Sequence, residues 1–381
     1  MKLFFFFFCL FLRVSASAEA PDAELEKLKK RIDDLERQQE ELLLGQRQSG
    51  TEVHSFLRDN LSLGGFFESA FTTIDGPDTR FQSMFTGSTM GLNLSAEFKN
   101  RIRFVNQTLT LLTYPLQNFN NNPSLTPHSR EFGDPAFVAT VTIGYLEVPL
   151  SSTLDLQAGV GYVPFGYAAQ QRELVLFIRR AGPQVLRTTN LIQPLWSGLH
   201  LSGTLENRRS GFNLYTMNSL DHSNTAGIGG RLWSKTVNEK IQGGLSTQIM
   251  KFAGHTSEIV GADLRLDSSR FIVTTEYVNH MTGEGRNPWS TYLEPALKLS
   301  DGEVLFFVFT DYAEDVLSKA NATTYDPVTR WENGVGVNWL PTTNTRFRAT
   351  AAREDYLGKR STIAGKNRDF WYFDLSAGVA F

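Results

Sequence analysis

From Leu61 to the C-terminus, apolar side chains alternate with polar or small ones at a period of two residues. A β-strand places successive side chains on opposite faces, so each such segment has one apolar face and one polar face. The clearest segment is the last one, where Trp371, Phe373, Leu375, Ala377, Val379 and Phe381 alternate with Tyr372, Asp374, Ser376, Gly378 and Ala380. This pattern predicts an all-β fold for most of the chain.

Sixteen segments carry the alternation. Along most of the chain, short polar connections alternate with longer ones. The longest are 113–135, 164–195 and 313–328. The predicted strands are 61–72, 86–98, 101–112, 136–148, 153–163, 196–206, 211–218, 226–234, 239–251, 257–266, 271–280, 290–299, 303–312, 329–339, 346–356 and 368–381.

Alternating short and long connections are typical of a transmembrane antiparallel β-barrel with periplasmic turns and outer loops. In such a barrel the apolar face meets lipid and the polar face lines the lumen. A soluble β-sandwich with the same alternation is the competing interpretation. Aromatic residues near strand ends are expected in the two interfacial girdles. The candidates for these girdles are Tyr145, Tyr162, Trp339, Trp371, Phe373 and Phe381.

The first 18 residues have the features of a signal peptide. Lys2 precedes an apolar run from Leu3 to Leu12, and Ala16-Ser17-Ala18 offers small residues for cleavage. The apolar run is too short for a permanent membrane helix. The only cysteine, Cys9, lies in this segment, so the predicted mature chain has no disulfide and no thiolate metal site.

Residues 22–47 have a different period. Leu25, Leu28, Ile32, Leu35 and Leu42 recur at spacings of three and four, which is a heptad stripe, with Gln39 at one seam position. This pattern predicts a short periplasmic coiled coil within residues 19–56, followed by the barrel in residues 57–381. A single amphipathic helix packed on another surface remains the alternative.

Two short stretches are similar to trimeric outer-membrane porins. Gly161-Tyr162-Val163-Pro164-Phe165-Gly166 resembles the start of their long third loop, most closely in the phosphate-selective and dicarboxylate-type groups. The final Phe381 resembles the terminal signal that the barrel-assembly machinery reads. The resemblance implies a sixteen-stranded homotrimeric barrel, in some members preceded by a coiled coil, with one pore per subunit narrowed by the inward-folded third loop. It also implies the outer membrane of a Gram-negative-type bacterium.

The predicted third loop is rich in arginine. Residues 164–195 contain Arg172, Arg179, Arg180 and Arg187 against Glu173, a formal charge of +3. If the loop enters the lumen, these five residues charge the constriction, and arginine binds phosphate or carboxylate through two parallel hydrogen bonds. The predicted basic lining of the wall consists of Arg101, Arg103, Arg231, Arg265, Arg346 and Arg348. Acids share that lining, namely Glu68, Glu97, Asp155, Asp263, Glu276 and Asp374.

The predicted function is passive diffusion of small hydrophilic solutes or ions, with an anion preference from the third loop. A nearly unselective pore and a plugged structural or adhesive barrel are the alternatives. An outer-membrane phospholipase is a further one, because His200 and Ser202 lie on one strand face. That pair is expected to face the lumen and has no obvious third residue to orient the imidazole, so no enzyme is predicted. No spacing of histidines predicts a metal site, and neither a cofactor nor nucleic acid is expected.

Overall fold

The computed structural model describes residues 60–76, 79–98, 101–113, 136–167, 195–205, 209–218, 226–252, 255–282, 285–319, 325–357, 362–363, 366–367 and 369–381. The predicted signal peptide and coiled-coil helix precede residue 60 and lie outside these described residues.

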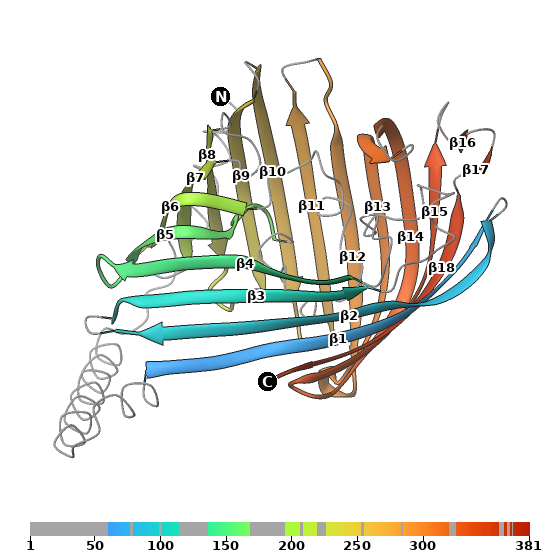
Figure 1. Ribbon diagram of the computed structural model, residues 1–381, viewed down its shortest axis with the longest axis horizontal. Helices are drawn as coiled ribbons and strands as arrows, with labels where there is room; N and C mark the ends of the chain where they lie inside the picture. The colour runs from blue at the N-terminus through green and yellow to red at the C-terminus, as the bar shows by residue number, and fades with distance from the viewer. Residues whose placement is uncertain are drawn as a thin grey trace. The chain divides into compact units, whose positions relative to one another are not determined.

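Sixteen antiparallel strands form one closed barrel, in which neighbours in the chain are neighbours in the wall (Figure 1). The last strand pairs with the first, and Figure 1 shows the C-terminus beside β1. At this seam the Phe381 N–H donates to the Gly65 carbonyl at 2.9 Å, and the Gly65 N–H donates to the Phe381 carbonyl at 2.8 Å. The predicted all-β barrel of sixteen strands is confirmed.

The barrel strands are β1 (Leu61–Gly76), β2 (Thr79–Glu97), β3 (Arg103–Thr113), β4 (Ala136–Pro149), β5 (Leu154–Tyr162), β6 (Leu195–Thr204), β7 (Ser210–Asn218), β8 (Ala226–Lys235), β9 (Ile241–Phe252), β10 (His255–Asp267), β11 (Phe271–Met281), β12 (Trp289–Leu299), β13 (Val304–Lys319), β14 (Tyr325–Thr342), β15 (Thr345–Leu357) and β18 (Phe370–Ala380). A 3-10 turn, η6 (Ser300–Gly302), follows β12, and β16 (Thr362–Ile363) pairs with β17 (Lys366–Asn367) between β15 and β18. Among the described residues, no helix has the length and apolar character required to cross a membrane.

The two ends of the barrel differ in their connections. The short-connection end carries Leu61, Phe381 and the turns after even-numbered strands up to β14. The long-connection end carries the segments after odd-numbered strands, of which 114–135 and 163–194 are the longest. The alternation that the sequence predicts is therefore present in part, because the connections after β1 and β9 have only two residues each, 77–78 and 253–254. Leu61 and Phe381 lie at the same end of the barrel.

Two predicted long connections are wrong. The connection predicted at 73–85 is strand except for 77–78, because β1 continues to Gly76 and β2 begins at Thr79. Most of 313–328 is strand, because β13 continues to Lys319 and β14 begins at Tyr325. The pairing register shifts between Ala313 and Val316, and Asp315 in this irregularity has a φ of 53°. A β-bulge of this kind interrupts the period-two pattern without ending the strand.

Candidate functional site

The alternation places the apolar side chains of β18 outside the barrel. Trp371, Phe373, Leu375 and Val379, together with Phe381 directly after the strand, are 39–60% exposed. On the opposite face Asp374 and Ser376 are buried, and Thr72 on β1 donates a 2.7 Å hydrogen bond to Asp374. The polar face therefore lines the lumen, as the sequence predicts for this strand.

The segment after β5 turns into the lumen. Val163 and Phe165 are completely buried, and a Cβ added to Gly261 on β10 would lie 2.7 Å from the Phe165 ring. The Gly166 N–H donates to the Ser246 hydroxyl on β9 at 2.9 Å, and its carbonyl accepts a hydrogen bond from Arg231 on β8. The beginning of the third long connection is thus fixed to the lumen wall across β8–β10.

Gly166 is required at this contact. Its φ is +61°, a backbone conformation that L side chains rarely adopt. A Cβ at this position would also lie 1.7 Å from a Glu276 carboxylate oxygen on β11. The next residue, Tyr167, accepts a hydrogen bond from Arg265, whose guanidinium carbon lies 5.0 Å from the tyrosine ring centroid.

The predicted constriction residues follow this anchored segment in the chain. They are Arg172, Glu173, Arg179, Arg180 and Arg187, and all five lie outside the described residues.

The predicted basic lining is largely formed of ion pairs. Arg103 lies 2.8 Å from Glu147. Arg231 lies 2.7 Å from Asp263, with both side chains fully buried.

The remaining predicted lining arginines lie on β10 and β15. Arg265 pairs with Asp267 at 2.8 Å, and Arg348 pairs with Glu68 of β1. Arg346 occupies the next position on the Arg348 face of β15, opposite Gly378. The lining therefore alternates in sign over short distances.

Arg101 does not belong to the barrel wall. It lies in the turn before β3 with a φ of +61°, and the strand begins at Arg103. The left-handed backbone of this turn breaks the alternation that would have placed the two arginines on one face.

A row of carboxylates was not predicted as a unit. The register places five lumen-facing acids opposite one another across β10–β15, with only Tyr292 between them. The row is Asp263, Glu276, Tyr292, Asp311, Glu332 and Glu354. Directly opposite residues have Cβ atoms about 5 Å apart, so this band concentrates negative charge.

Cations and hydroxyls contact this row. Arg330 lies 3.3 Å from Glu354, the Tyr372 hydroxyl donates to Glu332, and Arg231 pairs with Asp263. Each acid appears in the sequence as a single polar residue in an alternating strand. To predict that these acids form one row, the pairing register between neighbouring strands must be known. The sequence of a single strand does not contain that register.

Part of the lumen wall is apolar, which departs from the expected polar lining. Trp196, Met217, Ile259, Val278 and Val316 face inward and are at most 2% exposed. Tyr145 packs against this cluster, with its ring centroid 5.9 Å from that of Trp196, so its predicted place in a lipid-facing girdle is wrong.

Two further aromatic side chains lie flat on the inner wall. Phe307 and Phe309 of β13 are 0% and 4% exposed. Each covers a glycine of β14, because a Cβ on Gly336 would lie 2.3 Å from the Phe307 ring and one on Gly334 would lie 2.6 Å from the Phe309 ring. The missing side chains of β14 make room for these rings.

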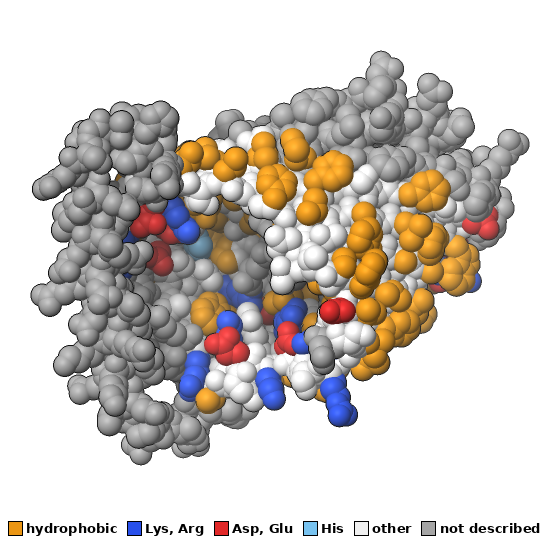
Figure 2. All heavy atoms as spheres, turned by 90° about the horizontal axis from the view of Figure 1, so that it is seen from below, with side chains coloured by type: hydrophobic (Ala, Val, Ile, Leu, Met, Phe, Trp, Pro, Cys, Tyr) orange, Lys and Arg blue, Asp and Glu red, His pale blue; other side chains and the backbone are white. Residues whose placement is uncertain are grey.

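Charged side chains gather in a hollow, while hydrophobic ones cover much of the adjoining outer surface (Figure 2). On the lumen face near the short-connection end, Lys298 lies 2.5 Å from Asp267, which also pairs with Arg265. These charged groups remain partly exposed, which suits contact with hydrated solutes.

His200 faces the lumen, as predicted, and is held by amides. One ring nitrogen lies 2.7 Å from the Gln157 side-chain oxygen and the other lies 3.1 Å from that of Asn213. Gln157 donates to Glu147 at 2.7 Å. Both imidazole nitrogens are therefore engaged by amides rather than by a serine and a carboxylate, which a nucleophile-activating histidine requires. Among the described residues, no three His, Cys, Asp or Glu side chains converge as a metal site.

No protein-family model matches the chain, and no curated protein sequence matches it. Solved structures do match its fold. OprB of Pseudomonas putida superposes with a TM-score of 0.61 at 10% identity, covering 86% of this chain and 96% of that one. The anion-selective porin of Comamonas acidovorans has a TM-score of 0.58 at 10% identity, covering 84% of this chain and 99% of that one.

OmpT of Vibrio cholerae, an outer-membrane protein described in a trimer form, has a TM-score of 0.54 at 10% identity, covering 85% of this chain and 100% of that one. At this identity the likeness concerns the backbone arrangement alone. The chain has the fold of the outer-membrane porins, a closed antiparallel barrel of sixteen strands.

Proposed function

We propose that the protein is an outer-membrane porin through which small hydrophilic solutes and ions diffuse passively, without covalent chemistry. The observation that carries this proposal is the segment Val163–Tyr167, which enters the barrel and is bonded to its inner wall. A loop fixed in this way narrows the lumen. The charged hollow in Figure 2 supports an aqueous path.

The outer surface supports a place in a lipid bilayer. On β14 the outward residues Trp331 and Trp339 are 44% and 48% exposed, and the outward positions between them are Asn333, Val335 and Val337, of which only Asn333 is polar. Eight residues at about 3.3 Å each span about 26 Å along a strand. With a tilt of roughly 40°, this stretch covers about 20 Å along the membrane normal, close to the height of the apolar band in such barrels.

Aromatic neighbours extend both interfacial bands. Trp289 lies 5.9 Å from Tyr277 and 5.0 Å from Tyr312, measured between ring centroids, near the long-connection end. Trp339 stacks 5.3 Å from Phe347 near the short-connection end. Aromatic rings at both edges of an apolar band are typical of outer-membrane barrels.

The short-connection end is assigned to the periplasm, because short turns lie on that side in this class of barrel. Residues 1–18 then serve as the export signal, and residues 19–56, the predicted coiled-coil helix and its linker, lie in the periplasm. Phe381 at the same end is the residue read by the barrel-assembly machinery. We assign a homotrimer, which the predicted coiled coil supports by bringing copies of the chain together.

An anion preference is proposed for the constriction. Arg172, Arg179, Arg180 and Arg187 outweigh Glu173 in the third loop. Arg103, Arg231, Arg265, Arg346 and Arg348 supply further positive charge on the wall, and Arg101 supplies it in a turn. The carboxylate row opposes this preference, so the measured selectivity reflects the difference between the two fields.

A structural or adhesive barrel with a plugged pore is the second candidate. The buried apolar cluster around Trp196 and Ile259 favours it, because lumen-facing apolar side chains suit a filled interior. A single measurement, the conductance of the reconstituted protein, distinguishes the two functions.

Reconstitution of the refolded protein into planar bilayers tests the proposal. A porin gives discrete conductance steps that scale with salt concentration and a reversal potential under a salt gradient. A folded, heat-modifiable barrel that inserts and gives no steps would overturn the diffusion function in favour of the plugged barrel.

A further inference from the structure

A row of polar side chains crosses the lumen wall on β3–β7. Backbone pairing places Arg103 opposite Glu147, Glu147 opposite Gln157, and Gln157 opposite His200. The side-chain contacts follow the same order, since Arg103 lies 2.8 Å from Glu147 and Gln157 donates to Glu147 at 2.7 Å. His200 Nδ1 lies 2.7 Å from the Gln157 side-chain oxygen, and Nε2 lies 3.1 Å from that of Asn213. These five side chains, the His200 row, hold the imidazole between two amides.

The Glu147 carboxylate fixes the orientation of the Gln157 amide. Glu147 is ionised by its pairing with Arg103, and an ionised carboxylate only accepts hydrogen bonds. The NH₂ group of Gln157 must therefore face Glu147, which leaves its oxygen facing His200. His200 Nδ1 consequently carries a hydrogen and donates it to that oxygen. The neutral ring is thus the Nδ1–H tautomer, with its lone pair on Nε2.

Asn213 is not fixed in the same way. Its contact with His200 Nε2 is the one side-chain hydrogen bond that it makes within the described part of the chain. In the observed orientation its oxygen faces Nε2, so both ring nitrogens face an acceptor. A neutral imidazole has a single N–H for two such oxygens, whereas an imidazolium donates to both. When the Asn213 amide is turned over, it presents an N–H to the lone pair of a neutral ring instead. The site therefore has two complete hydrogen-bond arrangements, which differ by one proton and one amide orientation.

The surroundings of His200 make a complete arrangement necessary and accept the charged ring. His200 is 7% exposed, so little water is at hand to replace a missing partner. Its ring centroid lies 5.3 Å from that of Trp196, within the distance at which an aromatic ring attracts a cation.

The charged groups around the His200 row are mostly paired. Arg103 pairs with Glu147, and Arg231, which lies opposite Asn213, pairs with Asp263 at 2.7 Å. Asp155, two positions before Gln157 on the same face of β5, adds one negative charge. The described titratable or charged side chains that face the row from β3, β4, β5, β7 and β8 are Arg103, Tyr145, Glu147, Asp155, Tyr215 and Arg231. Their formal charges do not oppose a proton on His200.

We propose that His200 is a specificity-determining residue of the pore, whose protonation adds a positive charge to the lumen wall and turns the Asn213 oxygen towards Nε2. The proposal rests on the diffusion function proposed for the barrel. Histidine is the side chain whose ordinary titration falls between pH 5 and pH 8, whereas arginines stay charged throughout this range. An added positive charge attracts anions and repels cations along an aqueous path. The preference for anions is therefore expected to rise as the pH falls from 8 to 5.

Reversal potentials under a KCl gradient, recorded at pH 8 and pH 5, test the role of His200. For the wild type we expect the ratio of chloride to potassium permeability to rise about twofold, the effect of one charge at roughly 10 Å in water. His200→Gln has no titratable ring and is expected to lose this rise. Other groups that titrate in this range, including the carboxylate row, contribute equally to both proteins and cancel in the comparison. An equal pH response in His200→Gln and the wild type would overturn the proposal.

Variants of Asn213 test the hydrogen-bond arrangement. Asn213→Asp places an ionised acceptor beside Nε2 and stabilises the imidazolium, so its change in selectivity is expected at a higher pH than in the wild type. Asn213→Leu removes the acceptor, so its change is expected at a lower pH. Any other order of the three midpoints would contradict the role assigned to Asn213.

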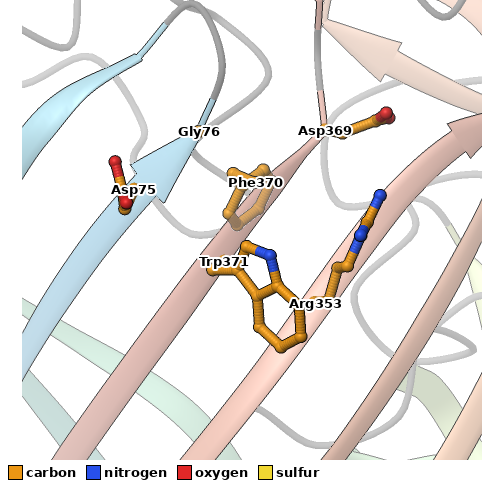
Figure 3. Close-up of a pocket in the computed structure, with 6 residues that line it drawn as sticks. All are labelled: Asp75, Gly76, Arg353, Asp369, Phe370 and Trp371. Carbon is orange, nitrogen blue, oxygen red and sulfur yellow. The ribbon is translucent and has the colours of Figure 1, made fainter.

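Two variants serve as matched controls. Ser202 lies two positions after His200 on the lumen face of β6 and outside the His200 row. Asp75 is an acid outside the lumen, on the outward face of β1, where it lines a cavity of about 300 Å³ at the long-connection rim (Figure 3). Ser202→Ala and Asp75→Asn are both expected to keep the pH response of the wild type. Its loss in either control would show that the response does not belong to His200.

Nitrogen NMR of the histidine-labelled protein in detergent micelles separates the site from the channel. The His200 signals are those absent from His200→Gln, and we expect the Nδ1–H tautomer at pH 8 and a doubly protonated ring at pH 5. A ring that titrates in this way in a barrel without conductance removes the channel and leaves the proton site. A ring that stays neutral at pH 5, or that is the Nε2–H tautomer at pH 8, overturns the site even when conductance is intact.

Discussion

Arg231 and Asp263 form an ion pair of 2.7 Å whose side chains are both fully buried inside the barrel. The same guanidinium donates to the Gly166 carbonyl, the point at which the third long connection is fixed to the wall. A buried charge pair is costly to leave half-complete, because the remaining charge has neither water nor a partner. The Arg231–Asp263 pair therefore contributes to the stability of the barrel wall and also holds the start of the third long connection in place.

Arg231→Ala is expected to destabilise the barrel by about 3–5 kcal/mol, because it leaves Asp263 buried without its partner. The free energy of unfolding is measured by urea titration in detergent micelles, with tryptophan fluorescence as the signal. Glu239→Gln is the control, since the Lys235–Glu239 pair is exposed and 3.8 Å long. Its expected effect is below about 1 kcal/mol, and equal losses in the two variants would contradict the assigned role.

The double variant Arg231→Met/Asp263→Leu separates charge from anchoring. Replacing both members with apolar side chains removes the unpaired charge, so much of the stability returns. The hydrogen bond to Gly166 does not return. We expect single-channel records of the double variant to show more open-state current noise than the wild type at similar stability.

Gly166→Ala is expected to displace the start of the third loop. The added Cβ meets the Glu276 carboxylate and the residue keeps a φ of +61° only under strain. We expect a change in single-channel conductance together with a loss of about 1–3 kcal/mol of stability. Gly302→Ala is the matched control, because Gly302 also has a positive φ of 96° with open space around it. A conductance change of the same size in Gly302→Ala would show that backbone strain alone is responsible.

The barrel could be predicted from the sequence because the residue pattern that specifies each strand lies within that strand. Each strand of a membrane barrel must hide its backbone polar groups and present an apolar face to lipid, so the alternation recurs in every strand. Errors arose where local geometry breaks the period. The positive φ of Arg101 and the bulge beside Asp315 are such places.

The interior could not be predicted to the same depth. Asp311, Glu332 and Glu354 become one carboxylate row only when the pairing of three strands is fixed. The aromatic lining has the same origin, since Phe307 faces inward where Gly336 on the next strand leaves space for its ring. Both features depend on which residues of neighbouring strands are paired. The sequence of a single strand does not specify that pairing.

Arg179→Ala/Arg180→Ala tests the proposed constriction. Removing two positive charges from a narrow aqueous path lowers anion permeability relative to cations. The reversal potential under a tenfold KCl gradient is therefore expected to move towards the cation equilibrium potential. Lys240→Ala in the exposed turn before β9 serves as a charge control. Unchanged reversal potentials in the double variant would remove these arginines from the constriction.

Gly336→Ala tests the packing of Phe307 on β14. The added methyl group occupies the volume of the phenylalanine ring, and overpacking of this kind costs about 1–3 kcal/mol. Shortening the ring side chain in the same molecule, with Phe307→Leu, is expected to recover part of the loss. Urea unfolding of the two single variants and the double variant gives the coupling energy, and strictly additive losses would show that the two positions do not share a packing site.

Deletion of residues 22–47 tests the predicted coiled coil. A heptad stripe of about three repeats is marginally stable alone, so its contribution adds to that of an interface between barrels. We expect the deletion to lower the temperature at which the trimer dissociates on semi-native gels, while the monomer barrel remains folded and heat-modifiable. Leu28→Asp/Leu35→Asp should reproduce the effect because it places charges in the seam, whereas Lys27→Asp/Lys30→Asp, at heptad positions that face away from the seam, should leave the trimer unchanged. Identical dissociation temperatures for the wild type, the deletion and the seam variant would assign assembly to the barrel surface and leave residues 22–47 as a helix without a part in the oligomer.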